Sequence, residues 1–199
     1  MSLQVLCLGD SLTYGFAMPR AQIWTALCAA QVGADFCNLA VNGNTTGGML
    51  AALPGALAAQ APDAVFLMGG TNDILYGGDL PGAKANMGAM LHLAVAAGAT
   101  PLIGLPIPPH QPVRADWAAL FPADAPALLA DYLDWLRQFA AAFHIPVVDF
   151  AGEFLRRAAR RGLAPAACYL DDGLHPSSSG HQVMAGIAAD ALMRLEHRR

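Results

Sequence analysis

The chain has 199 residues, of which 55% are hydrophobic and 13% charged, and its formal net charge at pH 7 is −4. This length fits a single domain, residues 1–199, and no shift of composition marks a second one. Proline and glycine interrupt each long apolar stretch before it could cross a bilayer, which argues against stable membrane insertion. The negative net charge argues against a nucleic-acid partner.

Short apolar segments alternate along the chain with longer helical ones. In chain order the pattern predicts strands at 3–8, 35–41, 64–68, 101–105 and 146–150, and helices at 21–31, 48–60, 82–97, 126–143 and 178–195, with a short basic helix at 152–161. Such alternation is typical of an α/β fold, a three-layer α/β/α sandwich with about five parallel strands. Right-handed crossovers then place the carboxyl ends of all strands at one edge.

Cysteines and arginines carry weaker signals. The four cysteines show no CxxC spacing and predict neither a metal site nor a disulfide framework. Arg156, Arg157, Arg160 and Arg161 form one basic surface on the short helix, either a solvated face or a surface for an anionic substrate or lipid. The first residues show no secretory signal pattern, so we expect a cytoplasmic protein, or an exported one if a leader has been removed.

Polar residues and glycines gather at the predicted carboxyl edge. The first strand ends on Gly9-Asp10-Ser11, which is read either as a turn with a helix cap or as a serine nucleophile at a strand end. A serine needs a base, and His175 stands three residues after Asp172 in a glycine-containing loop. Such a turn can present carboxylate and imidazole on one side, and its alternative reading is a capped loop.

Acyl transfer also needs donors for the oxyanion of the tetrahedral intermediate. The backbone N–H of Ser11, the unobstructed N–H of Gly43 and the side-chain amide of Asn72 are candidates, although a turn and a helix cap would explain Gly43 and Asn72 equally well. All of these residues fall at the same predicted edge of the sheet.

Four sequence blocks together resemble the SGNH, or GDSL, hydrolase family. They are Gly9-Asp10-Ser11-Leu12, Asn42-Gly43-Asn44, Gly70-Thr71-Asn72-Asp73 and Asp172-Gly173-Leu174-His175-Pro176, in that order, within a resemblance that spans residues 3 to about 192. The chain is most similar to the bacterial thioesterase, arylesterase and lysophospholipase branch. The resemblance implies a flavodoxin-like fold, a catalytic triad of Ser11, Asp172 and His175, an oxyanion hole of Ser11, Gly43 and Asn72, and hydrolysis without a metal or other cofactor.

Three other classes compete with this interpretation. A haloacid dehalogenase-type phosphotransferase would need a second aspartate in the Asp10–Thr13 stretch, which is absent. A metal-dependent hydrolase could use Asp171, Asp172, His175 and His181, but further ligands at metal-binding spacing are missing. A non-catalytic lipid- or carbohydrate-binding module would have no use for a proton relay.

Substrate contacts are expected from the loops at residues 76–79 and 106–125. Tyr76, Pro106, Ile107 and His110 are the candidate binding residues, and Trp117, Leu120 and Phe121 line either a pocket or the core. The glycines and length of these loops favour an open site for short acyl esters or thioesters. A carbohydrate acetylesterase or a lysophospholipase is the alternative, and the oligomeric state is not readable.

Overall fold

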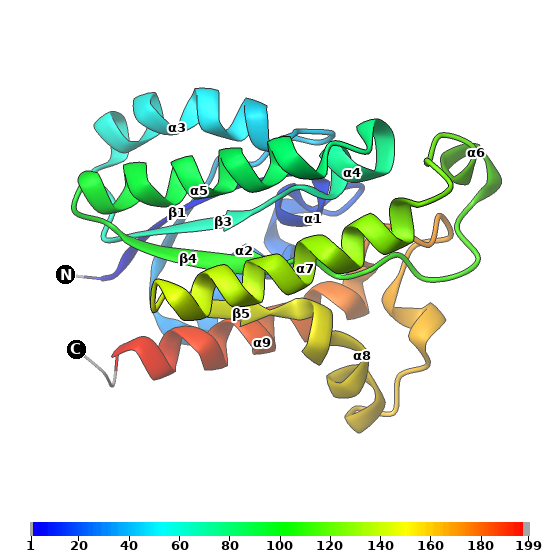
Figure 1. Cartoon of the computed structure of the whole chain (residues 1–199). Helices are drawn as coiled ribbons and strands as arrows, with labels where there is room; N and C mark the ends of the chain where they lie inside the picture. Colours follow the sequence, from blue (N-terminus) through cyan, green and yellow to red (C-terminus); the bar gives the residue numbers. More distant parts are fainter. Residues whose placement is uncertain (1, 197–199) are drawn as a thin grey trace.

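A parallel β-sheet forms the centre of the computed structural model, which describes residues 2–196 (Figure 1). Its strands are β1 (Gln4–Gly9), β2 (Asp35–Asn38), β3 (Ala64–Met68), β4 (Thr100–Leu105) and β5 (Val147–Asp149). In this part of the chain the sheet has five strands in the order β2-β1-β3-β4-β5, which is the flavodoxin-like order. The expected α/β class and three-layer sandwich are confirmed.

Two apolar cores lie on opposite faces of the sheet, because successive side chains of a strand point to opposite sides. Val5 and Cys7 of β1 pack in the core beneath α2 (Trp24–Val32), α8 (Phe150–Arg160) and α9 (Ser178–Glu196). Leu6 and Leu8 pack in the other core, under α3 (Thr46–Gln60), α5 (Leu80–Ala96) and α7 (Ala125–Ala142). Figure 1 shows α3 and α5 above the strands and α9 below them. Within residues 2–196, the helices are all too short or too polar to cross a membrane.

The sequence pattern missed the shortest helices and misplaced several boundaries by one to three residues. The structure adds α1 (Ser11–Tyr14), α4 (Thr71–Gly77), α6 (Ala115–Ala118) and the 3₁₀ turns η1 (Arg20–Gln22) and η2 (Pro165–Cys168). These segments have two turns or fewer, too few to show a helical period. Strand β2 ends at Asn38, whose side chain accepts a hydrogen bond from the Ala40 N–H at 3.0 Å and turns the chain. Phe150 begins α8 because Asp149 caps that helix at Gly152.

The carboxyl ends of β1 and β3 define the site. These neighbouring strands lie where the strand order reverses direction, the place where open α/β sheets bind ligands. Helix α1 follows β1 after one residue, and α4 follows β3 after Gly69 and Gly70. Both short helices and the loop that carries α6 lie at the same end of the molecule, on the right in Figure 1.

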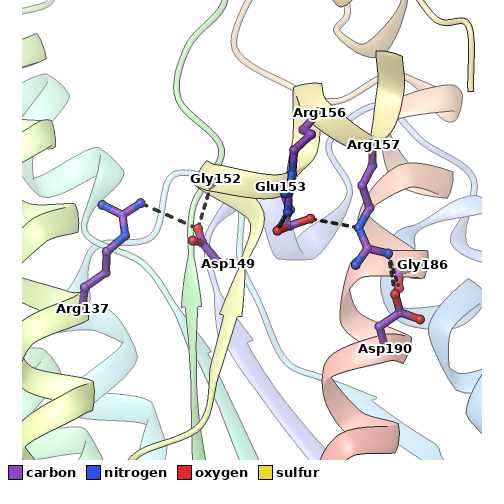
Figure 2. Close-up of polar contacts among 8 residues, drawn as sticks. All are labelled: Arg137, Asp149, Gly152, Glu153, Arg156, Arg157, Gly186 and Asp190. Carbon is purple, nitrogen blue, oxygen red and sulfur yellow. Dashed lines mark hydrogen bonds and ion pairs between the residues drawn. The ribbon is translucent and has the colours of Figure 1, made fainter. Parts of the chain in front are cut away.

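Arginines of α8 take part in contacts within the protein (Figure 2). Arg157 lies between Glu153 of its own helix and Asp190 of α9, with Nε 3.2 Å from Glu153 and Nη1 2.6 Å from Asp190. Arg156 also pairs with Glu153, and Arg161 donates to Gln182. Three of the four arginines therefore bind side chains of α8 and α9, which argues against a surface reserved for an anionic ligand.

Candidate active site

Ser11, His175 and Asp172 form one hydrogen-bonded chain of side chains. The Oγ atom of Ser11 lies 2.9 Å from Nε2 of His175, and Nδ1 of His175 lies 2.6 Å from Oδ2 of Asp172. All three residues are buried, with exposed fractions of 9% or less. With Nδ1 donating to the carboxylate, Nε2 is left to accept from the serine hydroxyl. The structure therefore brings the three candidate catalytic residues together.

A tight turn between η2 and α9 aligns Asp172 with His175. Oδ1 of Asp172 accepts from the backbone N–H groups of Leu174, at 2.8 Å, and of His175, at 3.0 Å. Burial would raise the pKa of Asp172, but the hydrogen bonds from His175 and Leu174 outweigh burial and lower this pKa below its usual range. Asp172 is therefore a carboxylate at neutral pH and stabilises a positive charge on the imidazole.

The three candidate oxyanion donors surround the same space. Ser11 is the first residue of α1, where the backbone N–H groups of a helix have no partner in the helix. Gly43 follows β2 with a φ of +73° and has no atom near the position of a Cβ. Nδ2 of Asn72 donates one hydrogen to the carbonyl of Asn44 at 2.8 Å, which leaves its second hydrogen for another acceptor.

A cavity of about 360 Å³ opens beside Ser11. Its wall is mostly apolar. The lining residues are Asp10, Ser11, Leu12, Phe16, Asn42, Gly43, Thr71, Asn72, Leu75, Tyr76, Ile107, Pro109, Trp117, Leu120, Leu174 and His175. The volume and lining suit a small molecule with an apolar part.

The expected substrate-binding residues divide into two groups. Tyr76 and Ile107 line the cavity, whereas Pro106 and His110 do not. The His110 ring stacks on Tyr169 with centroids 5.2 Å apart, and the backbone N–H of His110 donates to the Gly173 carbonyl at 2.7 Å. Pro106 is buried directly after β4, and His110 contacts the Asp172–His175 turn. A role of these two residues in substrate binding stays a prediction.

Residues of the loop after β4 and of the turn after α1 complete the wall. Trp117 and Leu120 line the cavity, but Phe121 lines a neighbouring one of about 160 Å³. The sequence pattern did not single out Phe16, although the centroid of its ring lies 4.3 Å from the centroid of the His175 ring. Its position five residues after Ser11 was the available signal, because a helix of one turn returns the chain to the nucleophile.

His181, a candidate metal ligand, has another role. Its Nδ1 accepts a hydrogen bond from the backbone N–H of Trp24 at 3.1 Å, at the first residue of α2. Within the described residues 2–196, no group of three or more histidine, cysteine, aspartate or glutamate side chains is arranged to hold a metal ion. All four cysteines are free thiols.

The chain is similar to known lipases and esterases. Residues 7–183 match the model of the GDSL-like lipase/acylhydrolase family. An arylesterase of Vibrio mimicus is 28% identical over 97% of this chain and 90% of that protein. Thioesterase 1/protease 1/lysophospholipase L1 of Escherichia coli is 28% identical over 96% and 84%, respectively.

A solved structure of a lipolytic protein of the G-D-S-L family from Veillonella parvula superposes with a TM-score of 0.80 at 25% identity, covering 97% of this chain and all of that one. The family match spans nearly the whole chain and includes the strand end, the oxyanion candidates and the start of α9. The chain therefore belongs to the GDSL-like lipase/acylhydrolase family and is an esterase.

Proposed function

We propose that the protein hydrolyses carboxylic esters and thioesters through an acyl-enzyme formed on Ser11. The observation that carries this proposal is the 2.9 Å contact between Ser11 Oγ and His175 Nε2, continued by the 2.6 Å contact from His175 to Asp172. A nucleophile, a base within hydrogen-bond reach and a group that orients the base are the parts that nucleophilic acyl transfer requires.

In the first half-reaction, Ser11 Oγ attacks the carbonyl carbon of the substrate while His175 Nε2 takes the hydroxyl proton. The carbonyl oxygen becomes an oxyanion and accepts hydrogen bonds from the Ser11 and Gly43 N–H groups and the second amide hydrogen of Asn72. Asp172 stabilises the imidazolium. The intermediate collapses when His175 gives its proton to the leaving alcohol or thiol, and the acyl group stays on Ser11.

In the second half-reaction, water replaces the leaving group. His175 takes a proton from the water, the resulting hydroxide attacks the acyl carbon, and the same donors stabilise the second oxyanion. Return of the proton to Ser11 Oγ releases the carboxylic acid. No step uses a metal or organic cofactor, so chelation with EDTA should leave the rate unchanged.

Cavity size and chemistry support short acyl esters as substrates. The 360 Å³ space has an apolar wall with the rings of Phe16, Tyr76 and Trp117, and cationic residues are absent from its lining. An uncharged acyl or aryl group is therefore favoured over a charged one. A set of p-nitrophenyl esters from acetate to palmitate, together with an acyl-CoA and an acetylated sugar, would define the range of substrates.

The cytoplasmic location stays a prediction, which fractionation of the producing cell would test.

The test of the mechanism is replacement of the nucleophile. Ser11→Ala should lower kcat at least ~10³-fold while the circular dichroism spectrum stays that of the wild type. A phosphonate ester should inactivate the wild type and label Ser11, as read by peptide mass spectrometry. Ser178→Ala, at a serine of α9 outside the cavity, is the matched control and should keep full activity. Labelling at another serine would disprove the assignment.

A further inference from the structure

Asp10 is a buried carboxyl group directly before the nucleophile, and the mechanism above gives it no role. It is 1% exposed. Its Oδ1 accepts from the Leu12 N–H at 2.9 Å and so caps α1, the helix that begins with Ser11. Its Oδ2 has no hydrogen-bond partner among residues 2–196. A carboxylate in such a place would leave a charged oxygen both desolvated and unpaired, which is costly.

The groups that face Asp10 do not favour a negative charge either. The titratable side chains that interact with it are Asp73 and Tyr76 of α4 and Tyr132 of α7. On the other side of Ser11 lie His175 and Asp172, which are hydrogen-bonded to each other. Burial first, and then Asp73, raise the pKa of Asp10 to about 7, against the opposing hydrogen bond from Leu12. Asp73 itself is engaged by the backbone N–H and the hydroxyl of Thr46.

Two residues near Asp10 carry hydroxyl groups: Thr71 lines the same cavity as Asp10, and Tyr132 interacts electrostatically with it. The hydroxyls of Tyr132 and Thr71 are buried without partners in the described part of the chain. A Cβ added to Gly70, the residue before Thr71, would lie 2.7 Å from the Tyr132 hydroxyl, and β1 pairs with β3 up to Gly9 and Met68. Asp10 and the Gly70–Thr71 segment therefore follow paired strand ends, and a protonated carboxyl group suits this neighbourhood better than a carboxylate.

We propose that Asp10 is a positioning residue that works as a neutral carboxylic acid, holding the first turn of α1 and keeping negative charge away from the developing oxyanion. The inference rests on the proposed function, because the oxyanion forms beside the Ser11 N–H. A carboxylate one residue away, itself only 1% exposed, would oppose that charge. Ionisation of Asp10 should thus slow acylation.

The test compares Asp10→Asn with the wild type as a function of pH. Asparagine keeps an oxygen acceptor for Leu12 and a donor in place of the carboxylic O–H, but it cannot ionise. We expect the ratio of kcat/KM, variant over wild type, to rise about tenfold or more between pH 6 and pH 9. Taking the ratio removes the pH dependence that the two proteins share. Asp149→Asn, at an aspartate that caps α8 through the Gly152 N–H and does not line the cavity, is the matched control and should give a ratio independent of pH.

Thermal unfolding gives a second readout that needs no activity. Because the pKa of Asp10 is higher in the folded than in the unfolded protein, the stability it contributes is lost as pH rises towards and through 7. The melting temperature of Asp10→Asn minus that of the wild type should therefore increase from pH 5 to pH 8. A rate ratio that is flat or falls with pH would overturn the proposal, as would a melting difference independent of pH. Failure of the proposed function would show differently, as full activity in Ser11→Ala.

Discussion

Gly173 sits between the acid and the base of the proposed triad and has no room for a side chain. Its φ is +71°, and a Cβ would lie 2.6 Å from the His110 carbonyl oxygen and 2.8 Å from that of Pro112. The same loop donates to this turn from His110 N–H and from Arg114 N–H, the latter to the Asp172 carbonyl at 3.0 Å. The loop after β4 thus supports the Asp172–His175 turn as well as lining the cavity.

Gly173→Ala should therefore cost both stability and rate. Positive φ alone costs an alanine about 1–2 kcal/mol, and the backbone overlap adds about 1–3 kcal/mol. Gly162→Ala separates the cost of the positive φ from the cost of the overlap, because Gly162 has a φ of +70° with no atom within 4 Å of its Cβ position. Urea unfolding should show the larger loss for Gly173→Ala, and only this variant should lose kcat. Equal effects of the two substitutions would contradict the account.

Asn72 is held by one of its amide hydrogens and uses the other in the proposed oxyanion hole. Asn72→Ala should lower kcat by about 10²–10³-fold with little change in KM, because the oxygen gains charge only in the transition state. Asn86→Ala is the matched control: its amide donates to Thr46 at 3.1 Å and does not reach the cavity. Steady-state kinetics on one ester would give kcat and KM for both variants. An effect confined to KM would make Asn72 a substrate-binding residue.

At the scale of elements, α8 and α9 are joined by a half-buried arginine. Arg157 bonds to Glu153 and Asp190, and its Nη1 also lies 3.4 Å from the Gly186 carbonyl of α9 (Figure 2). An arginine paired with two carboxylates stabilises the protein more than an isolated surface ion pair does, although solvent and salt screen both ion pairs.

Arg157→Met keeps the aliphatic packing and removes the charge. It should lower the free energy of unfolding by about 1 kcal/mol at low salt and by less at 1 M salt, with kcat unchanged. Arg160→Met, an exposed position of the same helix, is the control and should change stability by less than about 0.5 kcal/mol. Guanidinium is itself a salt, so urea is the denaturant to use. A loss that does not depend on salt would point to packing instead of charge.

At the scale of the whole molecule, one buried histidine links α9 to α2. His181 is fully buried and accepts the Trp24 N–H, which requires a neutral Nδ1. Burial first, and then the charges of Arg20 and His175, lower the pKa of His181 to about 4. Because this pKa is lower in the folded than in the unfolded protein, its contribution is present above about pH 6.5 and is lost as pH falls towards 4.

His181→Gln should reduce the loss of stability that the wild type shows as pH falls towards 4. Between pH 7 and pH 4.5 the wild type should lose about 2–3 kcal/mol more of its free energy of unfolding than the variant does. His92→Gln, at an exposed histidine of α5, should behave as the wild type. Urea titrations at the two pH values provide the measurement. Parallel losses in all three proteins would show that His181 is not the group responsible.

Local pattern was sufficient for the fold class and for the order of the major elements. Buried parallel strands are nearly all apolar and the long helices are separated by turn residues, so each of the five strands was located from its own residues. The four sequence blocks likewise marked Ser11, Gly43, Asn72, Asp172 and His175, because reactive groups at strand ends stand out against an apolar background. The single-domain assignment over 1–199 stays a prediction.

Tertiary structure decided what depends on residues far apart in the chain. One-turn helices such as α1 and α6 have no period to read, so tertiary packing decided the contact of the Phe16 ring with His175 and the choice between pocket and core for Trp117. His110 and Tyr76 look equally suited to touch a substrate in the sequence, yet only packing turned His110 towards Tyr169. The lack of a partner for Asp10 Oδ2 among residues 2–196 and the neutral state of His181 are also tertiary properties, because the ionisation of a buried group is set by the groups that surround it in space.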